Sequence, residues 1–160
     1  MDDAGQALLV PQPGDVMTIL TAVAALLLGL VCLVVVFGWR TLMHWRATGS
    51  TGFRGVPGGP GSLPWWGGLL FALSVVLMLT APVLAIVGWV TPADGWPHPL
   101  ISGLGMGTAL VGIALAVVAQ HEMGVTWQIG VDTDEHTTLI TDGVFARVRN
   151  PFFTSMVMVA

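Results

Sequence analysis

The sequence predicts an all-α fold: a polytopic membrane helix bundle with three full spans and the start of a fourth. Only 9% of the residues are charged and 54% are hydrophobic, whereas a soluble globular domain carries about 25% charged residues. Three apolar runs are also each long enough, at about 1.5 Å per residue, to cross the roughly 30 Å of hydrocarbon in a bilayer. The lipid bilayer is therefore the expected surrounding of this chain.

The N-terminal part divides into an arm and the first span. Residues 1–15 are acidic and interrupted by two prolines, so we expect an irregular arm. Residues 16–119 form the three-span bundle, and the first span covers about 16–38. A glycine-rich loop over 39–63 follows, since glycines and prolines are frequent there.

The remaining elements follow in order along the chain. The second span covers about 64–90, and we expect Pro82 to kink it, because proline removes a backbone hydrogen bond. The third span covers about 100–119. Residues 120–150 form a polar loop that carries the chain's most informative motif, and residues 151–160 begin a fourth membrane helix.

The cationic residues predict how the bundle is oriented. All five are arginines, and each lies either after the first span or before the fourth: Arg40, Arg46, Arg54, Arg147 and Arg149. With three crossings between the N-terminus and the fourth span, both regions fall on one side. The positive-inside rule makes that side cytoplasmic and the N-terminus external, in a bacterial-type inner (plasma) membrane.

The same residues argue against other kinds of site. Five arginines spread along one side, with no lysine, do not form the basic groove of a nucleic-acid-binding protein. His121 and Glu122 are adjacent, so they do not share a helix face, and no second cluster completes a metal site. We interpret this pair as a polar helix end and expect no metal.

The segment from Gly143 to Phe153, GVFARVRNPFF, is polar and cationic and stands directly before an apolar run. Asn150 is a good N-cap and Pro151 suits the first helical position, so a helix is expected to start here. Its first N–H groups would face the aqueous side beside Arg149 and attract an anionic group such as a carboxylate. These are the N–H groups of Phe152, Phe153 and Thr154.

This segment resembles the block, loosely "RHPxY", that precedes a membrane helix in the isoprenylcysteine carboxyl methyltransferase-like family of integral-membrane methyltransferases. The matching positions are Gly143, Phe145, Val148, Arg149, Asn150, Pro151 and Phe153. The similarity covers roughly residues 120–160. Two positions depart from the pattern: Asn150 replaces the common histidine, and Phe153 replaces the usual tyrosine and so lacks its hydroxyl.

The resemblance implies transfer of a methyl group from S-adenosylmethionine to a lipophilic acceptor, with Arg149 and Asn150 as catalytic residues. It implies that the cofactor is bound by residues of the block and by a tryptophan in the preceding loop: Gly143, Phe145, Val148, Arg149, Asn150, Pro151, Phe153 and Trp127. Other interpretations stay open. The arginines also suit membrane anchoring, and Phe145 and Phe153 also suit packing against lipid or the core.

Two other functions fit the sequence less well. A non-catalytic membrane assembly protein with a truncated methyltransferase fold would explain the loss of the tyrosine hydroxyl at Phe153. A small multi-span transporter subunit would normally need charged groups inside its spans, and the three predicted spans contain none.

Two further expectations concern assembly and completeness. Small residues at Gly103, Gly107 and Gly112 allow close helix approach in the third span, either within the chain or in a homo-oligomer. Family members continue through the fourth span and a return helix that completes the cofactor pocket. We therefore expect these 160 residues to be an incomplete catalytic unit with little methyltransferase activity alone.

Overall fold

A computed structural model of the chain confirms the all-α bundle. It describes residues 13–53, 55, 59–90, 98–124, 127 and 140–160. The elements are α2 (Pro13–Cys32), η1 (Leu33–Trp39), α3 (Arg40–Thr48), α4 (Leu63–Ile86), α5 (Pro99–Met123), η3 (Gly143–Ala146) and α6 (Pro151–Val159). Within the described ranges, three helices are long and apolar enough to cross a membrane: Val16–Thr48, Leu63–Ile86 and Pro99–Met123.

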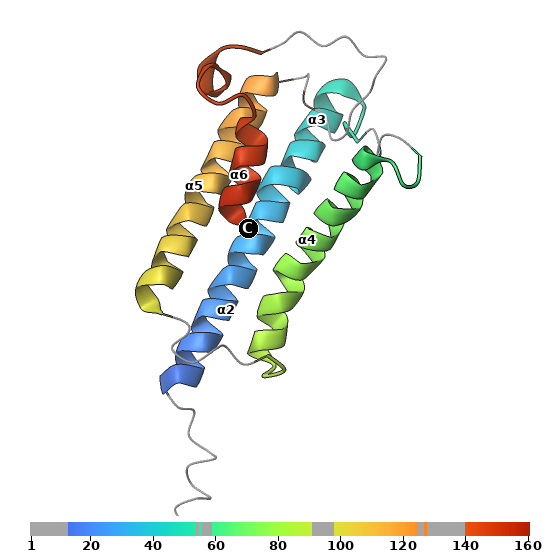
Figure 1. Cartoon of the computed structure of the whole chain (residues 1–160). Helices are drawn as coiled ribbons and strands as arrows, with labels where there is room; N and C mark the ends of the chain where they lie inside the picture. Colours follow the sequence, from blue (N-terminus) through green and yellow to red (C-terminus); the bar gives the residue numbers. More distant parts are fainter. Residues whose placement is uncertain (1–12, 54, 56–58, 91–97, 125–126, 128–139) are drawn as a thin grey trace, which may run out of the picture.

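The first helix is longer than predicted, because α2, the π-helical η1 and α3 join into one continuous rod (Figure 1). Residues 39–48, predicted as the start of a loop, are helical. They contain neither glycine nor proline, and the helix ends only at Gly49, whose φ of 74° is the left-handed conformation common at helix C-termini. The 33 residues from Val16 to Thr48 rise about 50 Å, so one end of the rod extends past a hydrocarbon layer of roughly 30 Å.

The second and third long helices also differ from their predicted limits. Ser62 caps α4, and α4 continues through Pro82 to Ile86. It ends before residue 90 because Gly88 turns the chain at a φ of 74°, and Trp89 N–H donates to the Leu84 carbonyl at 2.9 Å. In contrast, α5 continues past residue 119 to Met123, so polar side chains predicted for a loop belong to its last turn.

The packed core lies where the first helix, α5 and α6 meet. Its buried residues are Cys32, Val36, Ile113 and Ala116, with Leu28, Phe37, Phe152, Met156 and Val159 against them. Gly112 lets α6 approach α5 closely, since a Cβ there would lie 2.8 Å from the Ser155 carbonyl oxygen. Gly103 and Gly107 face open space instead, so only one of the three predicted small residues is used for packing within the described chain.

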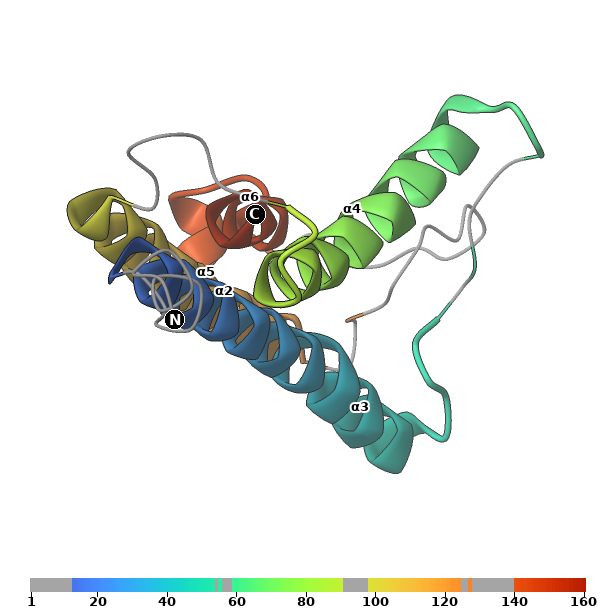
Figure 2. The same cartoon turned by 90° about the horizontal axis from the view of Figure 1, so that it is seen from below.

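The helix α4 lies on the outside of the bundle. It approaches α2 near Gly29, where Met78 and Leu79 lie about 3.5 Å from a Cβ position, and it diverges from α3 toward its own N-terminus (Figure 2). None of its residues is buried. Its exposed leucines and valines therefore suit a lipid surrounding, in which apolar surface needs no protein cover.

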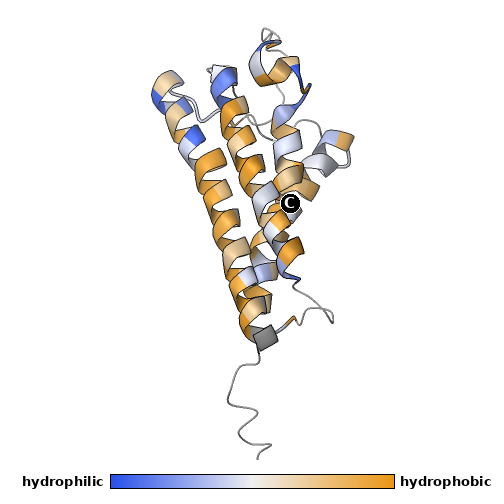
Figure 3. Ribbon diagram, turned by 90° about the vertical axis from the view of Figure 1, so that its left-hand side faces the viewer, coloured by the Kyte–Doolittle hydropathy of each residue, from blue (hydrophilic) through white to orange (hydrophobic). Residues whose placement is uncertain are grey.

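Polar residues concentrate at one end of the bundle, as Figure 3 shows by hydropathy. This end contains α3, the last turn of α5, η3 and the first residues of α6 (Figure 1). Arg40 and Arg46 belong to α3, Arg147 and Arg149 lie between η3 and α6, and Arg54 lies outside the described residues. The long helices between the two ends are almost uniformly apolar.

The close packing at Gly112 predicts a difference between two matched substitutions in α5. Gly107→Ala places its methyl group in open space, and the better helix propensity of alanine is worth up to about 1 kcal/mol. Gly112→Ala places the same group against the Ser155 carbonyl and Met158, and overpacking costs about 1–3 kcal/mol. We expect only Gly112→Ala to lower the thermal midpoint in detergent.

The thermal midpoint of each variant can be measured through the single cysteine, Cys32, because it is buried in the core and becomes exposed on unfolding. A dye that becomes fluorescent on reaction with a thiol reports its exposure during heating. Equal midpoints for the two variants would show that α6 does not depend on close contact with α5.

Candidate functional site

The last turn of α5 holds the polar end of the bundle together. Gln120 is buried, and its Nε2 donates to the Val36 carbonyl in η1 at 2.8 Å. Glu122 accepts a hydrogen bond from the Val144 N–H at 2.9 Å. The Gly124 carbonyl, just beyond the helix, accepts from the guanidinium of Arg40. Positions 120, 122 and 124 thus connect the end of α5 to both the first helix and the motif segment.

The hydrogen bond between Glu122 and Val144 explains why the motif segment begins with a glycine. Gly143 has a φ of 59°, a conformation that side chains other than glycine rarely adopt. A Cβ at this position would also overlap the Glu122 carboxylate. The absence of a side chain therefore lets Glu122 reach the N–H of Val144, and the short η3 turn is fixed against α5.

The helix start predicted from Asn150 and Pro151 is confirmed. Asn150 Oδ1 accepts from the Phe153 N–H at 3.3 Å, and its carbonyl accepts from the Thr154 N–H at 3.1 Å. Pro151 occupies the first helical position and is buried. The predicted cluster of three free N–H groups is wrong, because the cap already uses two of them. Within the described chain, the N–H of Phe152 is the one left for an external acceptor.

The motif residues fall into two groups by burial. Arg147, Arg149 and Asn150 are exposed, while Phe145 and Val148 are half-buried. Phe153 is 64% exposed. Its neighbour, which the family pattern leaves unspecified, points inward: Phe152 meets Phe37 edge-on, with ring centroids 6.2 Å apart. The motif therefore presents an open cationic surface beside a packed helix start.

Trp127, which was predicted to contribute to a cofactor pocket, is buried against the first helix. Its side chain is only 2% exposed. The Arg40 guanidinium lies 5.3 Å from its ring centroid, within the range of a cation–π interaction. His44 packs edge-on at 5.6 Å, and a Cβ on Gly52 would lie 3.0 Å from the indole. Trp127 thus packs against α3.

Two residues of this cluster, Arg40 and His44, were not among the candidates predicted from the sequence. Both were assigned to a loop, where their spacing carries no information. In a continuous helix a spacing of four residues places two side chains on one face. The lack of glycine and proline between residues 39 and 48 is the sequence signal that predicts a continuous helix here, with Arg40 and His44 on one face.

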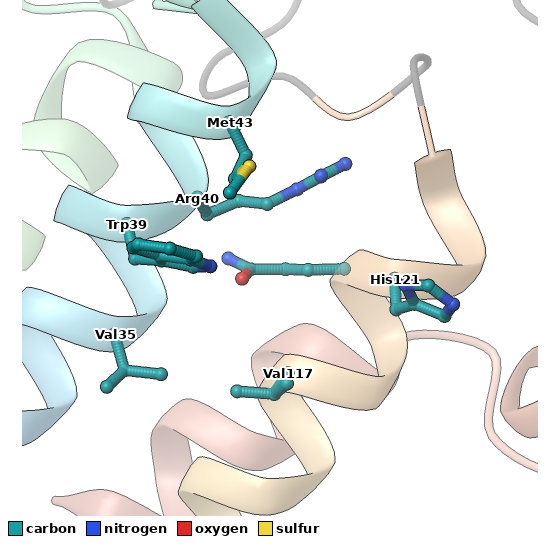
Figure 4. A pocket seen from close by; sticks show the side chains of 7 residues that line it. Val35, Trp39, Arg40, Met43, Val117 and His121 are labelled. Atoms are coloured by element: carbon teal, nitrogen blue, oxygen red, sulfur yellow. The ribbon is translucent and has the colours of Figure 1, made fainter. Parts of the chain in front are cut away.

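A partly open cavity of about 330 Å³ lies between the first helix and α5 (Figure 4). Val35 and Val117 face each other across its apolar part, and Arg40 extends over its other end from the first helix. The complete lining is Val35, Trp39, Arg40, Met43, Val117, Gln120 and His121. None of the motif residues from Gly143 to Phe153 contributes to it.

No family model, curated protein or solved structure matches this chain. Among the described residues, no three histidine, cysteine or acidic side chains are grouped closely enough to hold a metal ion. The candidate site therefore consists of the cationic motif surface and the cavity, two separate features at the same end of the bundle.

The contact between Glu122 and Val144 predicts how the motif segment is held. Glu122→Ala removes the acceptor, so we expect η3 to detach and trypsin to cleave faster after Arg147 and Arg149. Glu122→Gln loses the same charge but keeps a side-chain carbonyl oxygen that accepts from the Val144 N–H, so its cleavage should stay close to that of the unaltered chain. Equal acceleration in both variants would mean that charge, and not this hydrogen bond, fixes the segment.

Proposed function

We propose that this protein is a membrane methyltransferase that transfers a methyl group from S-adenosylmethionine to a lipophilic acceptor. The observation that carries the proposal is the motif segment: an N-capped, proline-initiated helix start with Arg149 exposed beside it, next to apolar membrane-type helices. This is the arrangement expected from the resemblance to isoprenylcysteine carboxyl methyltransferase-like proteins. The glycine at the start of the block also has a structural reason, its contact with Glu122.

The residues at this helix start suit the amino-acid end of the cofactor. Arg149 is a cation at the surface, and the Phe152 N–H lies in the first turn of α6, where the helix dipole favours a negative charge. Together they would bind the carboxylate. Phe145, in the preceding η3 turn, offers a half-buried aromatic ring suited to contact with a sulfonium or an adenine. When bound, S-adenosylmethionine supplies an activated methyl group.

The apolar bundle suits a lipophilic acceptor. Its long helices expose leucine, valine and phenylalanine side chains over most of their length, and α4 has no buried residue. An acceptor dissolved in the bilayer would therefore reach the polar end by moving along the helices. A carboxylate or another acceptor that needs no deprotonation suits this site, because the block from Gly143 to Phe153 contains no histidine, acidic or cysteine side chain that could act as a base.

The proposal predicts that Arg149 matters more than Arg147 for binding S-adenosylmethionine. Arg149→Ala should weaken binding about tenfold or more, since hydrogen bonds to charged groups contribute about 1.5–3 kcal/mol. Arg147→Ala removes the same charge two residues away and should change the affinity much less. Isothermal titration calorimetry of each variant in lipid nanodiscs with S-adenosylmethionine measures both affinities.

A modified ligand isolates the carboxylate contact. Decarboxylated S-adenosylmethionine keeps the sulfonium and the adenine, so its affinity should be insensitive to Arg149→Ala. Absence of binding of either ligand at about 1 mM, the weak end of specific affinity, would instead favour a non-catalytic membrane protein. Equal losses from the two arginine variants would mean that general positive charge attracts the ligand.

The proposal places the motif in the cytoplasm, because the four arginines that the structure describes lie at the same end of the bundle. Ser50 closely follows α3, which ends at this end of the bundle, and Val90 closely follows α4, which ends at the other. Cysteines introduced at these positions in a Cys32→Ala background should therefore differ in intact cells. We expect a membrane-impermeant maleimide to label Val90→Cys and to label Ser50→Cys only after the membrane is permeabilised. The reverse pattern would invert the orientation.

A further inference from the structure

The cavity between the first helix and α5 has no part in the proposed methyl transfer, yet its lining is amphipathic. Arg40 lies toward one end, Val35 and Val117 face each other at the other, and Gln120 and His121 line the cavity from α5. Its volume of about 330 Å³ lies at the lower end of the range for ligand sites, roughly 300–1,000 Å³. A ligand that fits it has a polar head and an apolar body.

The charge of the polar end identifies the head group. No acidic side chain lines the cavity, and the carboxylate of Glu122 is directed to Val144 instead. Arg40 uses one nitrogen for the Gly124 carbonyl, but its buried Nε has no hydrogen-bond partner among the described residues. A guanidinium near a low-dielectric layer is stabilised by a charged acceptor, and it binds phosphate oxygens in a bidentate manner.

The position of the cavity along the helices indicates the depth of this head group. Trp39 lines the cavity and is 57% exposed, and tryptophan side chains are enriched at the membrane–water interface. On the apolar side of Trp39 the first helix is hydrophobic, and beyond it α3 carries Arg40, His44 and Arg46. The polar end of the cavity thus lies at the level of lipid phosphates, and the valines lie at the level of acyl chains.

A π-helical segment of the first helix contributes to one wall of the cavity. Leu33–Trp39 is a π-helical segment, a rare conformation that often occurs at functional positions. Within it the Val36 carbonyl accepts from the Gln120 side chain, which holds the two helices together at the floor of the polar end. Val36 and Phe37 face α6 and the core, whereas Val35, Trp39 and Met43 face the cavity.

We propose that this cavity binds one anionic phospholipid, with its phosphate at Arg40 and its acyl chains along Val35 and Val117. The site is separate from the motif, so the proposal does not depend on methyl transfer. A charged lipid held here would neutralise Arg40 and fix the first helix against α5.

Brominated lipids test the proposal, because bromine quenches the fluorescence of tryptophans nearby. The full chain in zwitterionic detergent is titrated with phosphatidylglycerol brominated on its acyl chains, and with brominated phosphatidylcholine for comparison. We expect a saturable quenching component with phosphatidylglycerol only, and its absence in Trp39→Phe. Equal quenching by the two lipids would overturn the proposal, as would displacement of the lipid by inorganic phosphate alone.

Two pairs of variants locate the site. Arg40→Gln should weaken binding of phosphatidylglycerol about tenfold, in line with the loss of a charged hydrogen bond, whereas Arg46→Gln removes an equal charge from α3 outside the cavity and should have little effect. Because Arg40 also contacts Gly124 and Trp127, Val117→Phe provides an independent measurement. It fills the apolar part without touching Arg40, and it should abolish the saturable component while the thermal midpoint stays the same. Unchanged binding in Val117→Phe, or equal losses in the two arginine variants, would overturn the site.

Discussion

The last turn of α5 is the constraint on which the polar end of this protein depends. The long helices are apolar and have little to specify how they meet, since lipid contacts an apolar side chain as favourably as another helix does. Gln120, Glu122 and Gly124 supply directed hydrogen bonds instead, to Val36, Val144 and Arg40. Hydrogen bonds of this kind have a defined geometry, so they fix the register of the first helix and the position of the motif segment.

Features set by neighbouring residues could be predicted from the sequence. The apolar runs determine the three long helices, and Asn150 with Pro151 determines the start of α6. Both depend on interactions within one or two helical turns. The helix ends were predicted less well: α3 and the last turn of α5 contain polar residues, and polarity alone suggested loops. Gly49, Gly88 and Gly124, all with positive φ, lie at or just after the ends of α3, α4 and α5 and mark where these three helices terminate.

The candidate site could be predicted only in part, because its key contacts join residues far apart in the chain. Gln120 and Val36 are separated by 84 positions, as are Arg40 and Gly124. Nothing in a single sequence indicates such a pair. Trp127 was selected as a tryptophan in a polar loop, yet its contacts are with Arg40 and His44. The motif residues were found because they are consecutive, while the cavity residues come from two separate helices.

The motif and the cavity are physically connected even though they share no residue. Both are attached to the same turn of α5: Glu122 holds the motif, while Gln120 and His121 line the cavity. A ligand that fixes the first helix against α5 would also limit the motion of Glu122, and therefore of η3 and of the Arg149 that follows it. An effect of this kind transmits free energy only if the ligand favours one position of the turn over another. The short path from Val36 through Gln120, the last turn of α5 and Glu122 to Val144 is the structural element through which such coupling would pass.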